Sequence, residues 1–273
     1  ETGPYTFNPY PLSCIKPQQL KTVLVFGAGK SATVLINYLK QVCTTHQWQL
    51  IVADAHLPTA QRKTGTHPSA RAVAVNVTVP DERTALIHQA TVVISLLPPH
   101  LHKLVAVDCV HIGRPLLTAS YVDEDIRSLA PAITEKGLLF LCEMGLDPGI
   151  DHMSAMQLVD EIRSKGGHIT SFLSHCGGLV APESDTNPWH YKISWNPRNI
   201  VRAGSAGAVF RKDNNTITKT YQQVFADCSI LAVAELPLLN WYPNRDSLSY
   251  MPLYQLEDCL LYTSPSPRDR QKS

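Results

Sequence analysis

The first half of the chain alternates short apolar runs with segments in which apolar residues recur at helical spacing. The first run, 21–26 (KTVLVF), is continuously β-branched and apolar, as expected of a strand buried on both faces of a sheet. Apolar residues at 32, 35, 36 and 39 then mark a helix. Further strands are expected at 48–54, 71–77, 91–97, 114–120 and 137–142, and helices at 81–89, 101–112 and 123–136. This alternation predicts an α/β fold with a doubly wound parallel sheet.

The second half of the chain has a different pattern. Residues 168–176 (HITSFLSHC) alternate apolar and polar positions, which favours a half-buried strand, and 208–224 has the pattern of a hairpin around Asp213-Asn214-Asn215. Both features predict an antiparallel second domain of α+β type.

The turn after the first predicted strand reads Gly27-Ala28-Gly29-Lys30-Ser31-Ala32, a G-x-G-x-x-A pattern. The first glycine allows a tight turn, the second lets the backbone approach a pyrophosphate, and the small alanine lets helix and strand pack closely. The helix N-terminus would face the phosphates. Because the pattern lies between a predicted strand and a predicted helix, it indicates a Rossmann-type dinucleotide site, with residues 27–31 as cofactor contacts. The alternative is a glycine turn needed only for packing.

Asp54 ends the second predicted strand, 25 residues after Gly29, close to the spacing of an acid that binds the ribose. A carboxylate there accepts a hydrogen bond from the adenosine 2′-hydroxyl and repels a 2′-phosphate. We therefore expect NAD as the cofactor. Arg62 and Lys63 lie close behind and keep NADP open as the alternative.

Two further strands end at the carboxyl edge of the predicted sheet, where ligands bind in such folds. In ISLLPPH (94–100) the proline pair ends the strand and lays the chain across the cofactor, so Ser95 and Leu96 are expected contacts. Ser95 is equally explained as a plain polar strand end. In TASY (118–121), Ser120 and Tyr121 should point into the same crevice.

The loop after the sixth predicted strand, EMGLDPGIDH, crowds two carboxylates and a histidine among glycines and a proline within its last eight residues. Asp147 precedes a proline, which keeps it out of a helix, and it has no evident structural task. Asp151 is most simply a helix N-cap, and Met153 and Met156 most simply core. His152 is either a positioned acid–base group or a surface residue.

Composition narrows the function classes. The chain has 273 residues, of which 44% are hydrophobic and 17% charged, and a net charge of +1. It has no basic excess to hold nucleic acid, and no apolar run near the ~18–20 residues of a membrane span. Seven cysteines, an odd number without a CxxC pair, argue against a disulfide framework and a zinc site. Residues 1–20 contain four prolines and no signal peptide. We expect a metal-free cytoplasmic protein.

Three blocks carry a family resemblance: GLDPGIDH (145–152), SHCGGLVAPESDTNPWHYKISWNPRN (174–199) and YPNRDS (242–247). Together they resemble the saccharopine dehydrogenase family, the L-glutamate-forming branch also called saccharopine reductase, from about residue 23 to about 258. The resemblance implies a Rossmann domain followed by an α+β substrate domain. It also implies reversible cleavage of L-saccharopine to L-glutamate and L-2-aminoadipate 6-semialdehyde in lysine metabolism, with NAD or NADP.

The resemblance also implies site residues. Saccharopine carries three carboxylates and a secondary amine, so its site needs arginine. Arg245 matches the family's substrate arginine, with an ion pair to Asp246 as the alternative; Arg198 and Arg202 are weaker candidates. Tyr121 and Ser120 would contact substrate, and Asp147 would hold the ammonium and accept its proton.

The second block contributes three further positions. Cys176 is a catalytic candidate or inert packing. His175 stands where the family commonly has tyrosine. Trp195 would pack near the nicotinamide or in the core.

The expected organisation is an irregular proline-rich segment (1–20), a dinucleotide-binding domain (21–147), an incomplete substrate domain (148–261) and a non-native tail (262–273). Family sequences continue beyond YPNRDS, so we expect a C-terminally truncated member with impaired activity. Competing interpretations are a dehydrogenase for another secondary amine, a non-catalytic NAD(P)-binding protein, or an inactive fragment. A homodimer is the default assembly.

Overall fold

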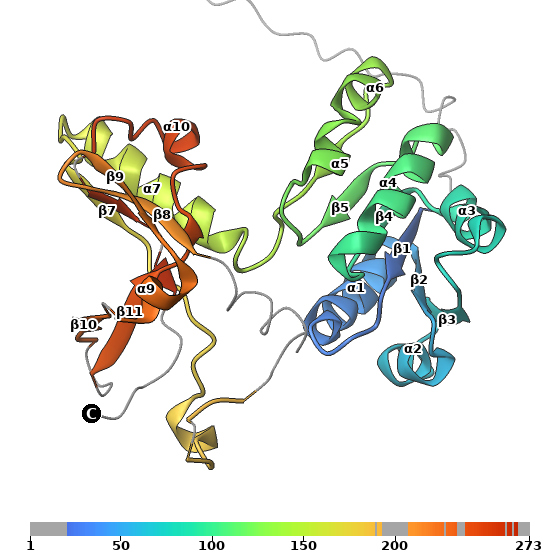
Figure 1. Ribbon diagram of the computed structural model, residues 1–273. Coiled ribbons are helices and arrows are strands. Elements are labelled where there is room, and N and C mark those ends of the chain that lie inside the picture. The colour runs from blue at the N-terminus through green and yellow to red at the C-terminus, as the bar shows by residue number, and fades with distance from the viewer. Residues whose placement is uncertain are drawn as a thin grey trace, which may run out of the picture. The chain divides into compact units, whose positions relative to one another are not determined.

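The computed structural model describes residues 21–188, 190–192, 207–226, 228–233, 238–259, 261–263 and 265–266 (Figure 1). Backbone contacts divide the chain into two compact units. The first contains the residues up to Thr118 together with Val122–Cys142, and the second contains Ala119–Tyr121 and everything from Glu143 onward. Tyr121 and Asp147 therefore belong to the same unit.

The first unit is a six-stranded parallel sheet with the order β3-β2-β1-β4-β5-β6. Its strands are β1 (Thr22–Phe26), β2 (Gln49–Asp54), β3 (Ala70–Ala74), β4 (Val92–Ser95), β5 (Leu116–Thr118) and β6 (Phe140–Leu141). This is the strand order of dinucleotide-binding Rossmann folds, in which the order reverses beside β1. The predicted doubly wound sheet is confirmed.

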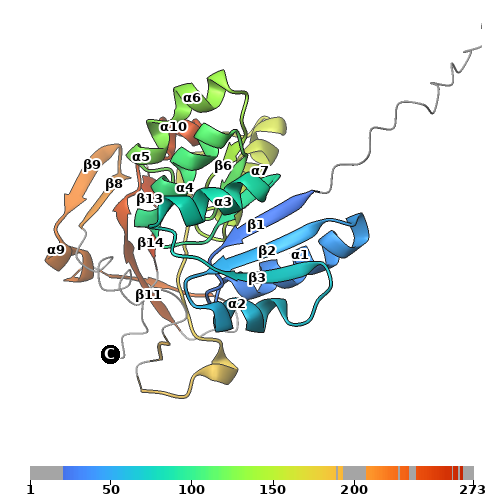
Figure 2. The same cartoon turned by 90° about the vertical axis from the view of Figure 1, so that its right-hand side faces the viewer.

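Helices cover both faces of this sheet (Figure 2). One face packs against α1 (Ala32–His46) and α2 (Leu57–Thr64), and the other against α3 (Pro80–Gln89) and α4 (Pro99–Ile112). Alternate residues of the central strand enter the two cores: Leu24 and Phe26 one, Val23 and Val25 the other. A strand buried on both sides has to be apolar throughout, which explains KTVLVF.

One local prediction for the first unit was wrong, and one helix was not anticipated. The helix expected at 123–136 is two short helices, α5 (Glu124–Arg127) and α6 (Ala130–Glu135), because Pro131 has no N–H to continue the hydrogen-bond ladder of α5. Helix α2 was not predicted, because within it only Ala60 and Thr64 are buried and its other positions are mainly polar.

The second unit is built around a mixed sheet of β12-β8-β13-β7, with β9 paired to β8. Its strands are β7 (Ser171–Leu173), β8 (Ala208–Lys212), β9 (Asn215–Lys219), β12 (Arg245–Asp246) and β13 (Leu261–Thr263). A smaller sheet pairs β10 (Ser229–Leu231), β11 (Leu239–Pro243) and β14 (Pro265–Ser266). Helices α7 (Ile150–Ser164), α9 (Tyr221–Ala226) and α10 (Met251–Tyr254) and the 3-10 turn Pro182–Ser184 complete the described elements.

The predicted hairpin is confirmed, since β8 and β9 pair antiparallel around Asp213 and Asn214, which have φ values of 49° and 62°. Two successive left-handed residues are what a two-residue hairpin turn of type I′ requires. The expectation of a purely antiparallel domain was wrong, because β12 and β13 return from far along the chain and pair parallel with β8 and β7. Residues 221–226, in part assigned to the hairpin, form α9.

The core of the second unit corrects two further predictions. Tyr262 is 1% exposed and stacks on Phe172 with 5.1 Å between ring centroids, so the predicted non-native tail does not begin at 262. In α7, Met156 packs against this core beside Val159, as predicted. Met153, also predicted to be core, is 55% exposed because it lies on the other side of the helix.

Within the residues that the structure describes, no helix combines the length and apolar character needed to cross a bilayer.

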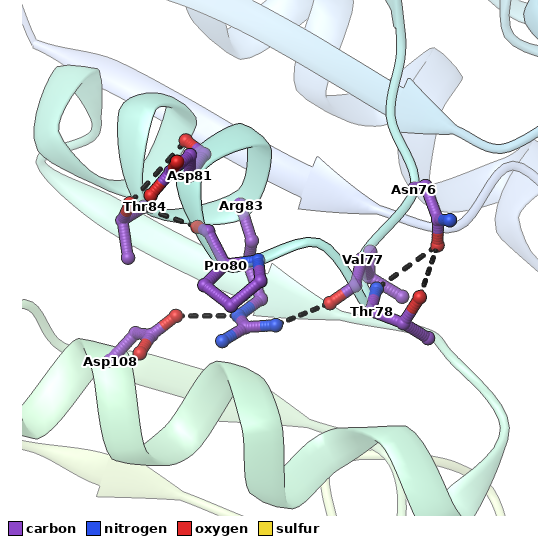
Figure 3. Close-up of polar contacts among 8 residues, drawn as sticks. All are labelled: Asn76, Val77, Thr78, Pro80, Asp81, Arg83, Thr84 and Asp108. Atoms are coloured by element: carbon purple, nitrogen blue, oxygen red, sulfur yellow. Dashed lines mark hydrogen bonds and ion pairs between the residues drawn. The ribbon is translucent and has the colours of Figure 1, made fainter.

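A buried ion pair joins two helices of the first unit (Figure 3). Arg83 of α3 is 5% exposed; its Nε donates to Asp108 Oδ2 of α4 at 2.5 Å and its Nη1 donates to the Val77 carbonyl at 2.5 Å. A buried charge is stable only while its partners remain. The pair therefore fixes α3 and α4 to the segment after β3.

We expect Asp108→Ala to lower the free energy of unfolding by about 3–5 kcal/mol, because Arg83 would stay buried without its counter-charge. The matched control is Asp125→Ala, which removes the pair Lys103–Asp125, 2.7 Å long but with side chains 53% and 54% exposed. An exposed pair contributes less than about 1 kcal/mol. Urea unfolding followed by circular dichroism measures both variants. Equal losses in the two would contradict the importance of the buried pair.

Candidate functional site

The glycine-rich turn has the geometry of a pyrophosphate-binding loop. Gly27 has φ +97°, and a Cβ there would lie 2.8 Å from the Leu96 carbonyl oxygen, so only glycine fits. A Cβ on Gly29 would meet nothing within 4 Å, which leaves its backbone open to a ligand. Ala32 is fully buried, and Ser31 at the N-cap of α1 makes no side-chain bond to the helix. The first-turn amides of α1 thus lack a side-chain acceptor and suit a phosphate.

Asp54 clamps this turn. Its Oδ2 accepts from the Ala28 N–H at 2.7 Å, and its Oδ1 accepts from the His56 N–H at 2.9 Å. The carboxylate therefore connects the glycine turn to the start of α2. Sequence reasoning gave Asp54 a ribose-binding role and did not anticipate this structural one.

A buried cluster of three polar side chains lies at the ends of β4 and β5. Ser95 is fully buried, with its Oγ 2.8 Å from His102 Nδ1, and Thr118 Oγ1 lies 3.4 Å from His102 Nε2. Burial lowers the pKa of His102 to about 4, so the imidazole is neutral at physiological pH. His102 was missed by sequence reasoning. Its spacing with Val105, Ala106 and Cys109 on the buried face of α4 is the signal that would have found it.

In the second unit, three predicted residues meet. The Tyr121 hydroxyl donates to Asp147 Oδ1 at 2.7 Å, and Cys176 lies close enough for the charge of this carboxylate to act on its thiol. Burial, and then Asp147, raise the pKa of Cys176 to about 12 and move the pKa of Tyr121 well above its usual range. At neutral pH, Asp147 thus has one uncharged hydrogen-bond donor, Tyr121, and an uncharged thiol beside it.

A tight turn presents Asp147. Gly149 has φ +150°, and a Cβ there would lie 2.6 Å from the Gly145 nitrogen and 2.7 Å from the Glu143 carbonyl oxygen. The Gly145 N–H donates to the Pro148 carbonyl at 2.9 Å. Gly149, not Asp151, is the N-cap of α7; Asp151 lies in the first turn and its Oδ1 accepts from the Gly149 N–H at 2.8 Å. The predicted N-cap position was therefore wrong by two residues, because the turn itself needs the cap to be glycine.

Aromatic residues near α10 surround His152. Its Nδ1 hydrogen-bonds the Tyr254 hydroxyl, and its ring stacks on Tyr250 with 4.4 Å between centroids. The Tyr250 hydroxyl donates to Glu143 Oε1 at 3.1 Å. The surface interpretation of His152 was wrong, because its side chain is only 21% exposed. Its acid–base role stays a prediction. Sequence reasoning could not find the two tyrosines, because they lie about a hundred residues from their partners.

The other predicted positions have different surroundings. Arg245 is exposed, has φ +48°, and makes no ion pair within the described residues. Its alternative partner Asp246 instead accepts from the Leu248 N–H at 2.8 Å. His175 packs edge-on against Trp241 at 5.3 Å, and burial lowers its pKa. Trp195, Arg198 and Arg202 lie outside the described residues.

The strand order, the glycine turn and the clamp at the end of β2 define the first unit as a Rossmann-type dinucleotide-binding domain. The family model for the saccharopine dehydrogenase NADP binding domain matches residues 23–141, and the model for the saccharopine dehydrogenase C-terminal domain matches residues 145–266. The chain belongs to the saccharopine dehydrogenase family. The resemblance seen in the sequence motifs is confirmed.

Relatives agree with this assignment. The chain is 33% identical to the saccharopine dehydrogenase (NADP+, L-glutamate-forming) of Saccharomyces cerevisiae over 238 residues, covering 87% of this chain and 52% of the yeast protein. It is 35% identical over 263 residues to the alpha-aminoadipic semialdehyde synthase of Arabidopsis thaliana, covering 89% of this chain and 25% of the plant protein. It thus spans about half the length of its yeast relative and a quarter of the plant one.

A solved structure agrees as well. Apo saccharopine dehydrogenase (L-Glu forming) from Saccharomyces cerevisiae matches with a TM-score of 0.83 at 32% identity, over 92% of this chain and 55% of the yeast chain. The expectation of NAD is not supported, because the family domain and the yeast relative are both named for NADP.

The Asp147 cluster yields a chemical test. We expect Asp147→Asn to lower the pKa of the Cys176 thiol, because the variant removes the negative charge that opposes the thiolate. At mildly alkaline pH the alkylation rate of Cys176 should rise, by about tenfold if the pKa falls by one unit. Peptide mass mapping after timed iodoacetamide treatment measures this rate. Cys109, whose pKa is raised to about 12 by burial and Asp108, serves as the internal control. An unchanged rate at Cys176 would show that Asp147 does not govern the thiol.

Proposed function

We propose that this chain forms the dinucleotide-binding region and part of the substrate-binding region of an oxidoreductase that cleaves L-saccharopine to L-glutamate and L-2-aminoadipate 6-semialdehyde, reversibly, in lysine metabolism. The observation that carries the proposal is Asp147, which accepts from the neutral Tyr121 hydroxyl and has the neutral Cys176 thiol beside it, in a family-specific loop. A carboxylate in this setting suits a cationic secondary amine. The names of the yeast and plant relatives support the same substrate.

The first unit would hold the cofactor through residues 27–31, and NADP is the one we propose, on the names of the family domain and the yeast relative. When bound, the nicotinamide would accept a hydride from the carbon next to the substrate amine. The open space over Gly29 and the uncapped start of α1 fit its pyrophosphate. Leu96, whose carbonyl packs against Gly27, completes the proposed contacts. Ser95 is not among them, because it is fully buried against His102, and the contact expected of Ser120 stays a prediction.

Asp147 manages the amine proton. It pairs with the substrate ammonium and accepts the N–H proton, so that the amine can become an imine as the hydride leaves. Tyr121 and Cys176 stay protonated, and the hydrogen bond from Tyr121 fixes the orientation of this carboxylate. Water then adds to the imine carbon, and cleavage of the C–N bond releases the aldehyde and glutamate.

Arg245 is the proposed carboxylate anchor. Its guanidinium is exposed and is not committed to an ion pair within the part of the chain that the structure describes. The fork geometry of arginine binds a carboxylate through two parallel hydrogen bonds. The left-handed backbone of this non-glycine residue, at φ +48°, is the kind of strain that concentrates at ligand sites. The expected homodimer, cytoplasmic location and role of Trp195 stay predictions.

We expect Asp147→Asn to lower kcat for L-saccharopine oxidation by about 10²–10⁴-fold, because the amine proton loses its acceptor. Formation of reduced dinucleotide, followed by its near-ultraviolet absorbance, measures the rate. The matched control is Asp160→Asn, which changes an exposed carboxylate of α7. Because the chain covers 52% of the yeast relative, we would assay both this chain and an extended chain, joined to the yeast segment that follows. We propose that the extension raises activity.

Two outcomes would separate the alternatives. Dinucleotide binding without reduction in either chain would favour the non-catalytic interpretation. Turnover on a different secondary amine, with none on L-saccharopine, would favour a related dehydrogenase.

A further inference from the structure

Two basic side chains are held side by side just beyond the clamp at Asp54. His56 precedes α2 and its Nδ1 lies 2.8 Å from Thr59 Oγ1, while Arg62 Nη2 donates to the same oxygen at 3.1 Å. His56 and Arg62 are both exposed, and neither has a carboxylate partner among the described residues. One hydroxyl thus organises an imidazole and a guanidinium on the solvent face of the first turns of α2.

Asp54 is the carboxylate that would repel an anion here, and both of its oxygens already accept hydrogen bonds. Asp54 directs one oxygen to the Ala28 amide and the other to the His56 amide. Two N–H donors stabilise and partly offset its negative charge. A carboxylate held in this way opposes a nearby phosphate less than one that faces solvent with both oxygens open.

The location is the adenosine end of the cofactor. In a sheet of this order the adenosine ribose lies beyond the carboxyl end of β2, beside the glycine turn. Asp54 ends β2 and is bonded to the turn itself, so the residues that follow it start from this place. Lys63, also on α2, hydrogen-bonds Thr33 in the first turn of α1, which adds an ammonium to the same edge.

We propose that His56, Thr59 and Arg62 bind the 2′-phosphate of NADP. This inference rests on the proposed function in one respect, that the first unit binds a nicotinamide dinucleotide. One guanidinium nitrogen of Arg62 donates to Thr59, and its other N–H groups would donate to phosphate oxygens. Asp54 then acts as the clamp of the loop, and the cofactor choice lies with α2.

The test compares two nucleotides that differ only by the phosphate in question. Adenosine 2′,5′-bisphosphate and AMP would be titrated into the intact chain by calorimetry. We expect the bisphosphate to bind at least about tenfold more tightly, the effect of one charge-assisted hydrogen bond. Arg62→Gln should remove most of this preference and leave AMP affinity unchanged.

The matched control is Arg71→Gln. Arg71 is an exposed arginine of β3, bonded to the neutral Gln89, and it lies three residues before the carboxyl end of its strand. Asp54→Asn gives a second readout: as a clamp its loss should weaken both nucleotides alike, whereas as a discriminator its loss should favour the bisphosphate. Loss of the preference in Arg62→Gln, with retention in Arg71→Gln, supports the site.

Three results would overturn it: equal affinities in the unaltered chain, a preference that survives Arg62→Gln, or a gain of bisphosphate affinity in Asp54→Asn. Binding of AMP without a preference overturns this inference alone. Failure of both nucleotides to bind overturns the proposed dinucleotide site as well.

Discussion

One backbone hydrogen bond, from the Glu143 N–H to the Ser120 carbonyl at 2.9 Å, sets the geometry of the catalytic candidates. Ser120 and Glu143 both belong to the second unit, and the two segments that contain them therefore run together. Tyr121 follows one of them directly and Asp147 follows the other, which brings the hydroxyl and the carboxylate within 2.7 Å.

Two glycine positions then determine what each unit presents. Gly27 lets β1 turn beneath the Leu96 carbonyl, and Gly149 lets the Asp147 turn close on Gly145 and Glu143. In both places the backbone adopts a φ that side chains rarely take and leaves no room for a Cβ. The first turn offers backbone amides to an anion, and the second offers a carboxylate to a cation.

Much of the fold and part of the candidate site could be predicted, because the deciding signals are local. Continuous apolar strands, the glycine turn and the Asp147 loop each lie within a few residues of sequence. The polar contacts of Asp54, and the pairing of Tyr250 and Tyr254 with Glu143 and His152, depend on segments that meet only in the fold. Likewise, the mixed sheet arises from β12 and β13, whose partners lie earlier in the chain.

The cofactor preference and the surroundings of His152 could not be predicted from the sequence, because both depend on contacts made only in the fold. A carboxylate at the end of β2 is ordinarily a sign of NAD, yet its meaning depends on where its two oxygens point. Here both oxygens accept backbone amides, and nothing in the residue's identity or spacing reveals this. His152 is a similar case, since only tertiary contacts distinguish an enclosed imidazole from a surface one.

The most direct measurement is isotope transfer from L-saccharopine deuterated at the side-chain carbon of its lysine part that is bonded to the secondary amine. The extended chain would be incubated with labelled substrate and oxidised dinucleotide, and the dinucleotide analysed by mass spectrometry. Deuterium in the reduced dinucleotide, with labelled semialdehyde and unlabelled glutamate as products, is the predicted result. Bound dinucleotide that acquires no deuterium would contradict a saccharopine-oxidising function.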